Sequence, residues 1–200
     1  MLASITPLGE RGRHRRWAVT AGWYLAGSAL GGATIGAAMG AAGSIVPESI
    51  RPAGAVLTWL AFALLALAAA IELRLVPLGL PSLRRQVNEN WLNMYRGWVV
   101  GVGFGFQLGL AVVTIITSPA IHAMLAIAFL THSPAAGLLV GVAFGVARTL
   151  PLLTTMRVTS PDRLVRLHTM FLAASRPANG VVAAVLVTSA VVAAVASGFA

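Results

Sequence analysis

The chain contains no cysteine and no lysine, and only five of its 200 residues are acidic. Without cysteine it can form no disulfide, iron–sulfur cluster or thiolate nucleophile. Charged residues amount to 10% of the chain, whereas a soluble domain carries roughly 25%. Hydrophobic residues make up 58% and the mean hydropathy is +0.87. This composition predicts an integral membrane protein rather than a soluble enzyme.

The sequence also lacks the usual patterns of metal and catalytic sites. Its histidines show neither close metal-ligand spacing nor an HExxH pattern. No nucleophile–base pair or carboxylate pair lies within the apolar blocks, so we expect no enzyme activity, no metal and no cofactor. The four histidines are His14, His122, His132 and His168.

The 14 basic residues are all arginines, give a formal net charge of +9 and lie mostly at the ends of the apolar blocks. This distribution is typical of the cytoplasmic side of a membrane protein rather than of a nucleic-acid-binding surface. We therefore expect anionic lipid headgroups at the arginine-rich segments. Arginine in place of lysine, with abundant Ala, Gly and Val, is typical of a bacterial genome rich in G and C and favours the bacterial inner membrane.

The apolar blocks are long enough to cross a hydrocarbon core of ~30 Å and predict an all-α, polytopic transmembrane helix bundle. We expect a basic cytoplasmic N-terminus, 1–16, followed by a single transmembrane domain, 17–200. Five spans fit the distribution of arginine, with six as the alternative. The expected spans are 17–46, 53–71, 98–131 with a break at Pro119, 135–156 and 179–199, and the expected cytoplasmic loops are 72–97 and 157–176.

Glycine recurs at every fourth position in three of the expected spans. Residues four apart share one helix face, where the missing side chains let two backbones approach closely. The pattern predicts a compact bundle with zipper-like glycine packing. The three rows are Gly32, Gly36 and Gly40; Gly101, Gly105 and Gly109; and Gly137, Gly141 and Gly145.

The two halves of the chain also resemble each other. PAGAVLTWLAF begins at Pro52 and PAAGLLVGVAF begins at Pro134, and each follows a proline-containing break. We therefore expect a two-repeat architecture, a plan common among transporters. Chance similarity between helices rich in Ala, Gly and Val is the alternative.

A stripe of polar residues lies on the third expected span, opposite its glycine row. On one continuous helix these side chains fall within about 60° of one another. They predict either the lining of a pathway or hydrogen bonds between helices. The stripe consists of Gln107, Thr114, Ser118 and His122.

Arg148 lies inside the fourth expected span. A charge in such a place is costly and is commonly paired or functional. Glu72, near the inner end of the second span, is a candidate partner. The alternative is that Arg148 extends to the cytoplasmic headgroups.

The segment 103–153, with Thr117-Ser118-Pro119 and the glycine-rich motif Gly137–Phe144, resembles the transmembrane domain of the DsbD/CcdA-type cytochrome c biogenesis family. The resemblance implies two repeats, each with a long helix broken by a Thr-Pro-Cys type motif. Members of that family carry electrons between thiols through two membrane cysteines. Ala120 stands where such a cysteine would be, and thiol exchange requires a thiolate. The resemblance therefore implies a related scaffold without thiol redox activity.

Two hypotheses for the function follow. The first is a carrier or permease for a small, anionic solute, with a path lined by the polar stripe and Arg148. The alternative is a non-catalytic membrane subunit or assembly scaffold that is related to cytochrome c biogenesis proteins. Under either hypothesis we expect the lipid bilayer, a second copy of the chain or a membrane protein as partner, and no nucleic acid.

Overall fold

The computed structural model describes residues 5–52, 54–78, 94–111 and 118–198. Every regular element among them is a helix, which confirms the predicted all-α membrane bundle. The elements are α1 (Pro7–Gly12), α2 (Trp17–Ser44), η2 (Glu48–Ile50), α3 (Gly54–Glu72), α5 (Gly97–Leu110), α6 (Ala120–Leu130), α7 (Pro134–Leu153), η3 (Thr154–Arg157) and α8 (Pro161–Gly198).

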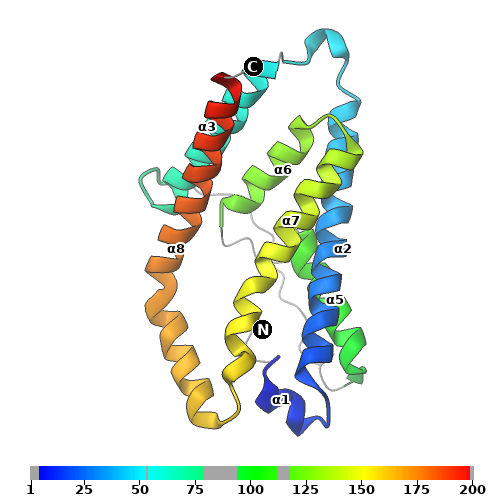
Figure 1. Cartoon of the computed structure of the whole chain (residues 1–200), viewed down its shortest axis with the longest axis vertical. Helices are drawn as coiled ribbons and strands as arrows, with labels where there is room; N and C mark the ends of the chain where they lie inside the picture. Colours follow the sequence, from blue (N-terminus) through cyan, green and yellow to red (C-terminus); the bar gives the residue numbers. More distant parts are fainter. Residues whose placement is uncertain (1–4, 53, 79–93, 112–117, 199–200) are drawn as a thin grey trace.

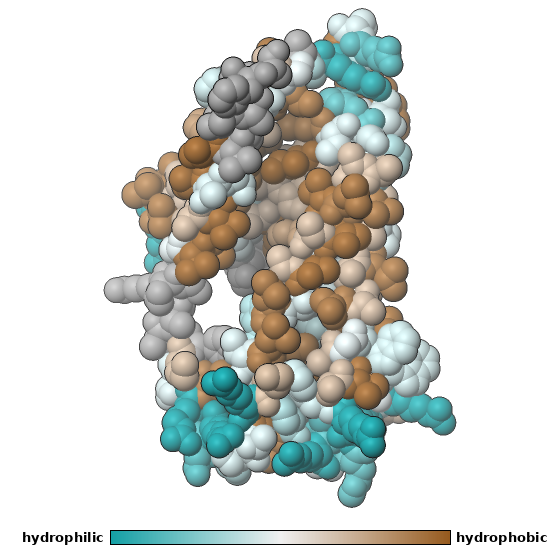
Figure 2. All heavy atoms as spheres, viewed as in Figure 1, coloured by the Kyte–Doolittle hydropathy of each residue, from teal (hydrophilic) through white to brown (hydrophobic). Residues whose placement is uncertain are grey.

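Three helical segments are long and apolar enough to cross a membrane, namely Trp17–Ser44, Gly54–Glu72 and Pro134–Arg157. Shorter apolar helices occupy Gly97–Leu110, Ala120–Leu130 and Asn179–Ser189. Hydrophobic side chains cover the middle of the molecule and hydrophilic ones gather at its two ends (Figure 2). This is the profile of a multi-pass membrane protein.

Helices α2, α5 and α7 form the most tightly packed part of the molecule, which we call the glycine trio. Helix α2 lies between the other two and touches both along its length (Figure 1). A Cβ atom added to Gly32 would collide with the carbonyl oxygen of Gly141, and one added to Gly105 would collide with that of Tyr24. The helices therefore touch backbone to backbone, which dispersion forces stabilise in a lipid environment.

Helices α3 and α8 form a second unit, which we call the outer pair. Their interface contains side chains rather than bare backbone, with Leu65 of α3 and Leu186 of α8 both buried in it. The outer pair joins the glycine trio mainly through α6, while α8 has little contact with α7. The two units are joined through η3 at the end of the molecule that holds α1 and the beginnings of α2 and α8 (Figure 1). We call this end the basic end.

Two expected segments differ from the structure. The third expected span, 98–131, is two helices, because α5 already ends at Leu110 and α6 begins at Ala120. Ala111 has a φ of 60°, a backbone conformation that ends a helix and that side chains other than glycine rarely adopt. The segment 157–176, expected as a loop, is helical from Pro161 onward, as part of α8. In the other expected loop, 72–97, residues 79–93 lie outside the described part.

Candidate functional site

The break between α5 and α6 is the main polar feature inside the bundle. Helix α5 begins at the basic end and α6 ends at the opposite end, so their inner termini lie at mid-height of the molecule (Figure 1). Such termini expose carbonyl groups at the end of α5 and N–H groups at the start of α6. In an apolar environment these groups need partners within the protein.

Arg148 of α7 binds the end of α5. Its Nη1 atom donates a hydrogen bond of 2.8 Å to the carbonyl oxygen of Leu108, and its guanidinium carbon lies 5.7 Å from the centroid of the Phe144 ring. A positive charge is favourable there, because the helix dipole makes the C-terminus of α5 negative. The hydrogen-bond partner of Arg148 is thus the carbonyl of Leu108, whereas the candidate partner Glu72 accepts a hydrogen bond from Ser118.

Glu72 binds the start of α6 instead. This buried residue ends α3, and its Oε2 atom accepts a hydrogen bond of 2.7 Å from the hydroxyl of Ser118. The Ser118 oxygen in turn accepts a 3.2 Å hydrogen bond from the backbone N–H of Ala120, the first residue of α6. A carboxylate suits the positive N-terminus of a helix. Opposite charges therefore meet the two inner helix ends, and we call this arrangement the polar clamp.

The predicted polar stripe does not exist as one helix face. Gln107 lies half-buried on α5, whereas Ser118 and His122 lie beyond the break. The 100° rotation per residue that placed them together therefore does not apply across Ala111. Thr114 lies outside the described residues. His122 adds one unusual group, since its Nδ1 atom is buried without a hydrogen-bond partner among the described residues.

The structure places the three predicted glycine rows at the helix contacts of the trio. The row of α5 faces the backbone of α2 at Thr20, Tyr24 and Ser28. The row of α7 faces α2 as well, and Gly137 and Gly141 lie against the α2 row itself. The residues are Gly101, Gly105 and Gly109 on α5, Gly137, Gly141 and Gly145 on α7, and Gly32, Gly36 and Gly40 on α2.

Ser28 is a contact residue that the sequence analysis missed. Its buried hydroxyl donates a 2.7 Å hydrogen bond to the carbonyl of Gly145, and its backbone faces Gly109 of α5. It therefore joins all three helices of the trio. The signal was available, because position 28 extends the four-residue period of Gly32 and Gly36 by one step.

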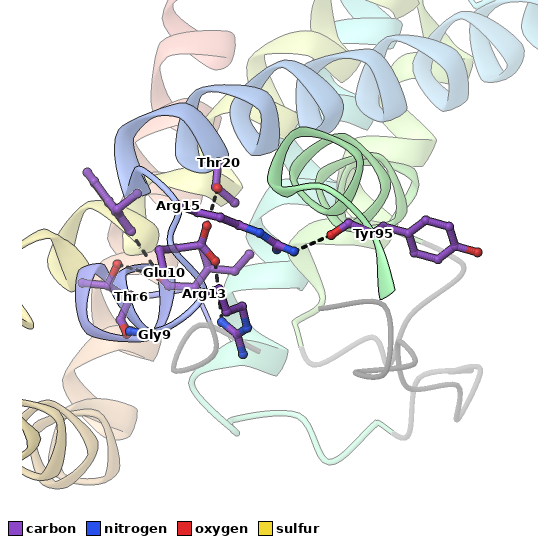
Figure 3. A network of polar contacts seen from close by, with 10 residues as sticks. Thr6, Gly9, Glu10, Arg13, Arg15, Thr20 and Tyr95 are labelled. Atoms are coloured by element: carbon purple, nitrogen blue, oxygen red, sulfur yellow. Dashed lines mark hydrogen bonds and ion pairs between the residues drawn. The ribbon is translucent and has the colours of Figure 1, made fainter. Parts of the chain in front are cut away.

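The sequence analysis also missed the role of the N-terminal segment, which is seated against the basic end of the trio rather than free in solvent. Glu10 of α1 is fully buried. Its Oε2 atom accepts a hydrogen bond from Thr20 of α2, and its Oε1 atom lies 3.6 Å from Nη1 of Arg13. Figure 3 shows this network, with Arg15 donating to the carbonyl of Tyr95 just before α5.

The same segment also contacts η3 and the residue that follows it. The hydroxyl of Thr155 donates to the carbonyl of Ile5, and the N–H of Leu8 donates to the carbonyl of Val158. A sequence signal existed in Thr6-Pro7, since threonine is a preferred N-cap and proline a preferred first residue of a helix. Thr6 indeed accepts a hydrogen bond from Gly9.

The described side chains at the helix break offer polar recognition, and none of them is a thiol. The break holds a guanidinium, a carboxylate, a hydroxyl and an imidazole, and the first three already bind groups of the protein. Among the described residues no group of three His, Asp or Glu side chains could hold a metal ion. Ala120, where the resemblance places a cysteine, begins α6 beside Ser118.

Comparison with known proteins gives two matches. The model of the family described as cytochrome c biogenesis protein transmembrane region matches residues 2–198. The chain is also 27% identical over 153 residues to the methylamine utilization protein MauF of Methylophilus methylotrophus. The aligned residues make up 75% of this chain and 53% of MauF. It thus spans about half the length of that curated relative. No solved structure matches the chain.

Proposed function

Because this chain belongs to the cytochrome c biogenesis transmembrane family, we propose that it is a non-catalytic membrane subunit that helps to assemble a partner protein. One observation carries the proposal. The family match covers nearly the whole chain, yet the chain has no cysteine. The scaffold is present and the thiol chemistry is impossible.

The polar clamp supports an assembly role over a carrier role. A carrier needs the ends of its broken helices free to bind solute and ions. Here Arg148 binds Leu108, and Glu72 binds Ser118 at the start of α6. The break is thereby bridged by the protein itself, which suits a structural element better than a solute path.

The similarity to MauF also supports an assembly role. The name of MauF links that protein to methylamine utilization, which agrees with an assembly protein that serves one metabolic system. We further propose that the chain lies in a bacterial inner membrane with its basic end in the cytoplasm, since arginines retained on that side would set this orientation.

Deletion of the gene tests the assembly role. We expect the loss of one or a few membrane or exported proteins at unchanged transcript levels, measured by quantitative proteomics. The thiol–disulfide state of exported proteins, measured by alkylation and gel shift, should stay unchanged. A general shift of these thiols toward the oxidised form would contradict the proposal.

Cysteine labelling separates the assembly role from the carrier role. The chain has no native cysteine, so single substitutions Q107C, S118C and H122C can be exposed to a membrane-impermeant maleimide in intact cells and in inverted vesicles. We expect no labelling at these positions and strong labelling in inverted vesicles of R16C, an exposed residue at the basic end. Labelling of all three break positions would support a water-filled path and a carrier.

A further inference from the structure

The N-terminal segment, residues 5–15, packs one apolar side chain against all three helices of the glycine trio. Ile5 is 1% exposed and forms one buried cluster with side chains of α2, α5 and α7. Its carbonyl oxygen accepts hydrogen bonds of 3.2 Å from the hydroxyl of Thr155 and of 3.3 Å from Nε1 of Trp17. We call this segment the N-terminal plug. Its partners in the cluster are Tyr24, Val100, Phe104 and Leu152.

The same cluster connects the N-terminal plug with the polar clamp. Leu108 of α5 packs against the cluster, and its carbonyl is the group that Arg148 binds. Val100 lies on the same helix, nearer to the basic end, and is fully buried. The plug therefore covers the apolar side chains that separate the clamp from solvent at the basic end.

A hydrogen bond from Thr20 fastens the plug to α2. The Thr20 hydroxyl donates to Oε2 of Glu10, whose side chain is fully buried (Figure 3). The other carboxylate oxygen, Oε1, has no hydrogen-bond partner among the described residues and lies 3.6 Å from Nη1 of Arg13. A buried carboxylate oxygen without a hydrogen bond raises the free energy of the docked form. Docking therefore depends strongly on the Thr20 hydroxyl.

The plug has little structure of its own to hold it in place. Helix α1 has six residues, far fewer than a helix needs to be stable in isolation. Arg11 and His14 are exposed, so the outer face of the plug stays in contact with solvent. Terminal segments of this kind open at a much lower free energy than a protein core. The trio, by contrast, is held by backbone contacts between its own helices.

We propose that the N-terminal plug is a reversible gate at the basic end. It detaches as a unit while the glycine trio stays folded, and its detachment uncovers the apolar cluster and admits water toward the polar clamp. The Thr20 hydroxyl is the latch that sets how often the plug opens. The inference does not depend on the proposed assembly role.

Cysteine labelling kinetics of the full chain test the proposal. The chain has no native cysteine, so V100C reports on the cluster beneath the plug and S28C on the interior of the trio, where Ser28 is fully buried. Each protein is purified in mild detergent, and its reaction with a water-soluble maleimide is followed by intact-protein mass spectrometry. Adding T20V, which keeps the shape of the side chain and removes the latch, should raise the labelling rate of V100C about tenfold or more. The rate of S28C should stay unchanged.

Two further substitutions are matched controls. T20S keeps the hydroxyl, so V100C/T20S should react as slowly as V100C. T34V removes the hydroxyl of an exposed threonine on the same helix, which donates to the carbonyl of Leu30, and should also leave the rate of V100C unchanged.

Three results would overturn the proposal. An unchanged rate of V100C in T20V would show that the plug is a permanent part of the fold. An equal rise at V100C and S28C would show that the segment opens only when the whole trio opens. An equal rise of V100C labelling in T34V and T20V would show a general effect of losing a threonine from α2 rather than the release of a latch.

Discussion

The glycine trio and the outer pair solve the same problem of helix contact in different ways. In the trio, α2 meets its neighbours through bare backbone at Gly32, Gly36 and Gly105. In the outer pair, α3 and α8 meet through Leu65, Leu186 and small alanines. Backbone contact leaves no room for adjustment, whereas flexible leucines can repack after a change. The trio is therefore the fixed frame, and the outer pair is the part that can adapt.

The largest expected effect tests the fixed frame. Gly36→Leu places a side chain against the backbone of α7 at Gly137 and Gly141. Neither backbone can withdraw without moving a whole helix, so we expect a loss of about 3 kcal/mol or more. Size-exclusion chromatography in detergent should show the loss of the monodisperse peak.

The control for this change lies on the same helix. A Cβ atom at Gly22 would meet nothing within 4 Å, so Gly22→Leu should leave the elution profile unchanged. Equal behaviour of the two variants would show that the close backbone contact between α2 and α7 does not fix the packing of the trio.

A smaller effect is expected when the outer pair is opened. Leu186→Ala removes a buried side chain from the contact between α8 and α3. We expect a loss of about 2 kcal/mol, at the low end for such truncations because the neighbouring side chains can close the cavity. The measurement is the unfolding free energy from denaturant titration followed by circular dichroism. Val185→Ala, which changes an exposed neighbour, should cost little, and a cost as large as that of Gly36→Leu would contradict the adaptable outer pair.

The polar clamp should contribute less to the unfolding free energy than the helix contacts of the glycine trio or of the outer pair. Arg148→Met keeps the length of the side chain but removes the charged hydrogen bond to Leu108. We expect a loss of about 1.5 kcal/mol, typical of a hydrogen bond to a charged donor. The same titration measures it, with Arg166→Met as the control for loss of an exposed charge. Indistinguishable curves for the two variants would show that the clamp does not stabilise the break.

The smallest effect concerns the hydroxyl that joins the trio. Ser28→Ala removes the hydrogen bond to Gly145 but leaves the close backbone contact intact. We expect about 0.6 kcal/mol, the usual contribution of such a bond between membrane helices. Thr34→Ala is the control, because the Thr34 hydroxyl donates to the carbonyl of Leu30 within its own helix. A loss above that of Arg148→Met would place the main polar stabilisation in the trio rather than at the break.

The sequence was sufficient to predict the helical membrane class, because composition and the length of apolar runs depend on the bilayer and not on the tertiary structure. The helix break was predicted only roughly. Pro119 marked its end, but α5 ends at Leu110, and the positive φ of the following Ala111 could not be predicted from the residue type. A helical-wheel argument across that point therefore grouped Gln107 with Ser118 incorrectly.

The polar contacts were the part that sequence could not predict. Arg148 was recognised as a functional candidate, but its partner is a backbone carbonyl, and every residue offers one. Glu10 is one acidic residue in a basic segment, and nothing in that segment predicts that it is fully buried against Thr20. Such pairings depend on which helix ends meet, and local patterns do not contain that information.

The contact between the N-terminal segment and the region after α7 has a consequence for the timing of biosynthesis. The carbonyl of Ile5 binds the hydroxyl of Thr155, a residue 150 positions later in the chain. At about 5 to 20 residues per second, a ribosome needs about 8 to 30 s to synthesise the intervening chain. Ile5 thus reaches this contact only after residue 155 has been synthesised.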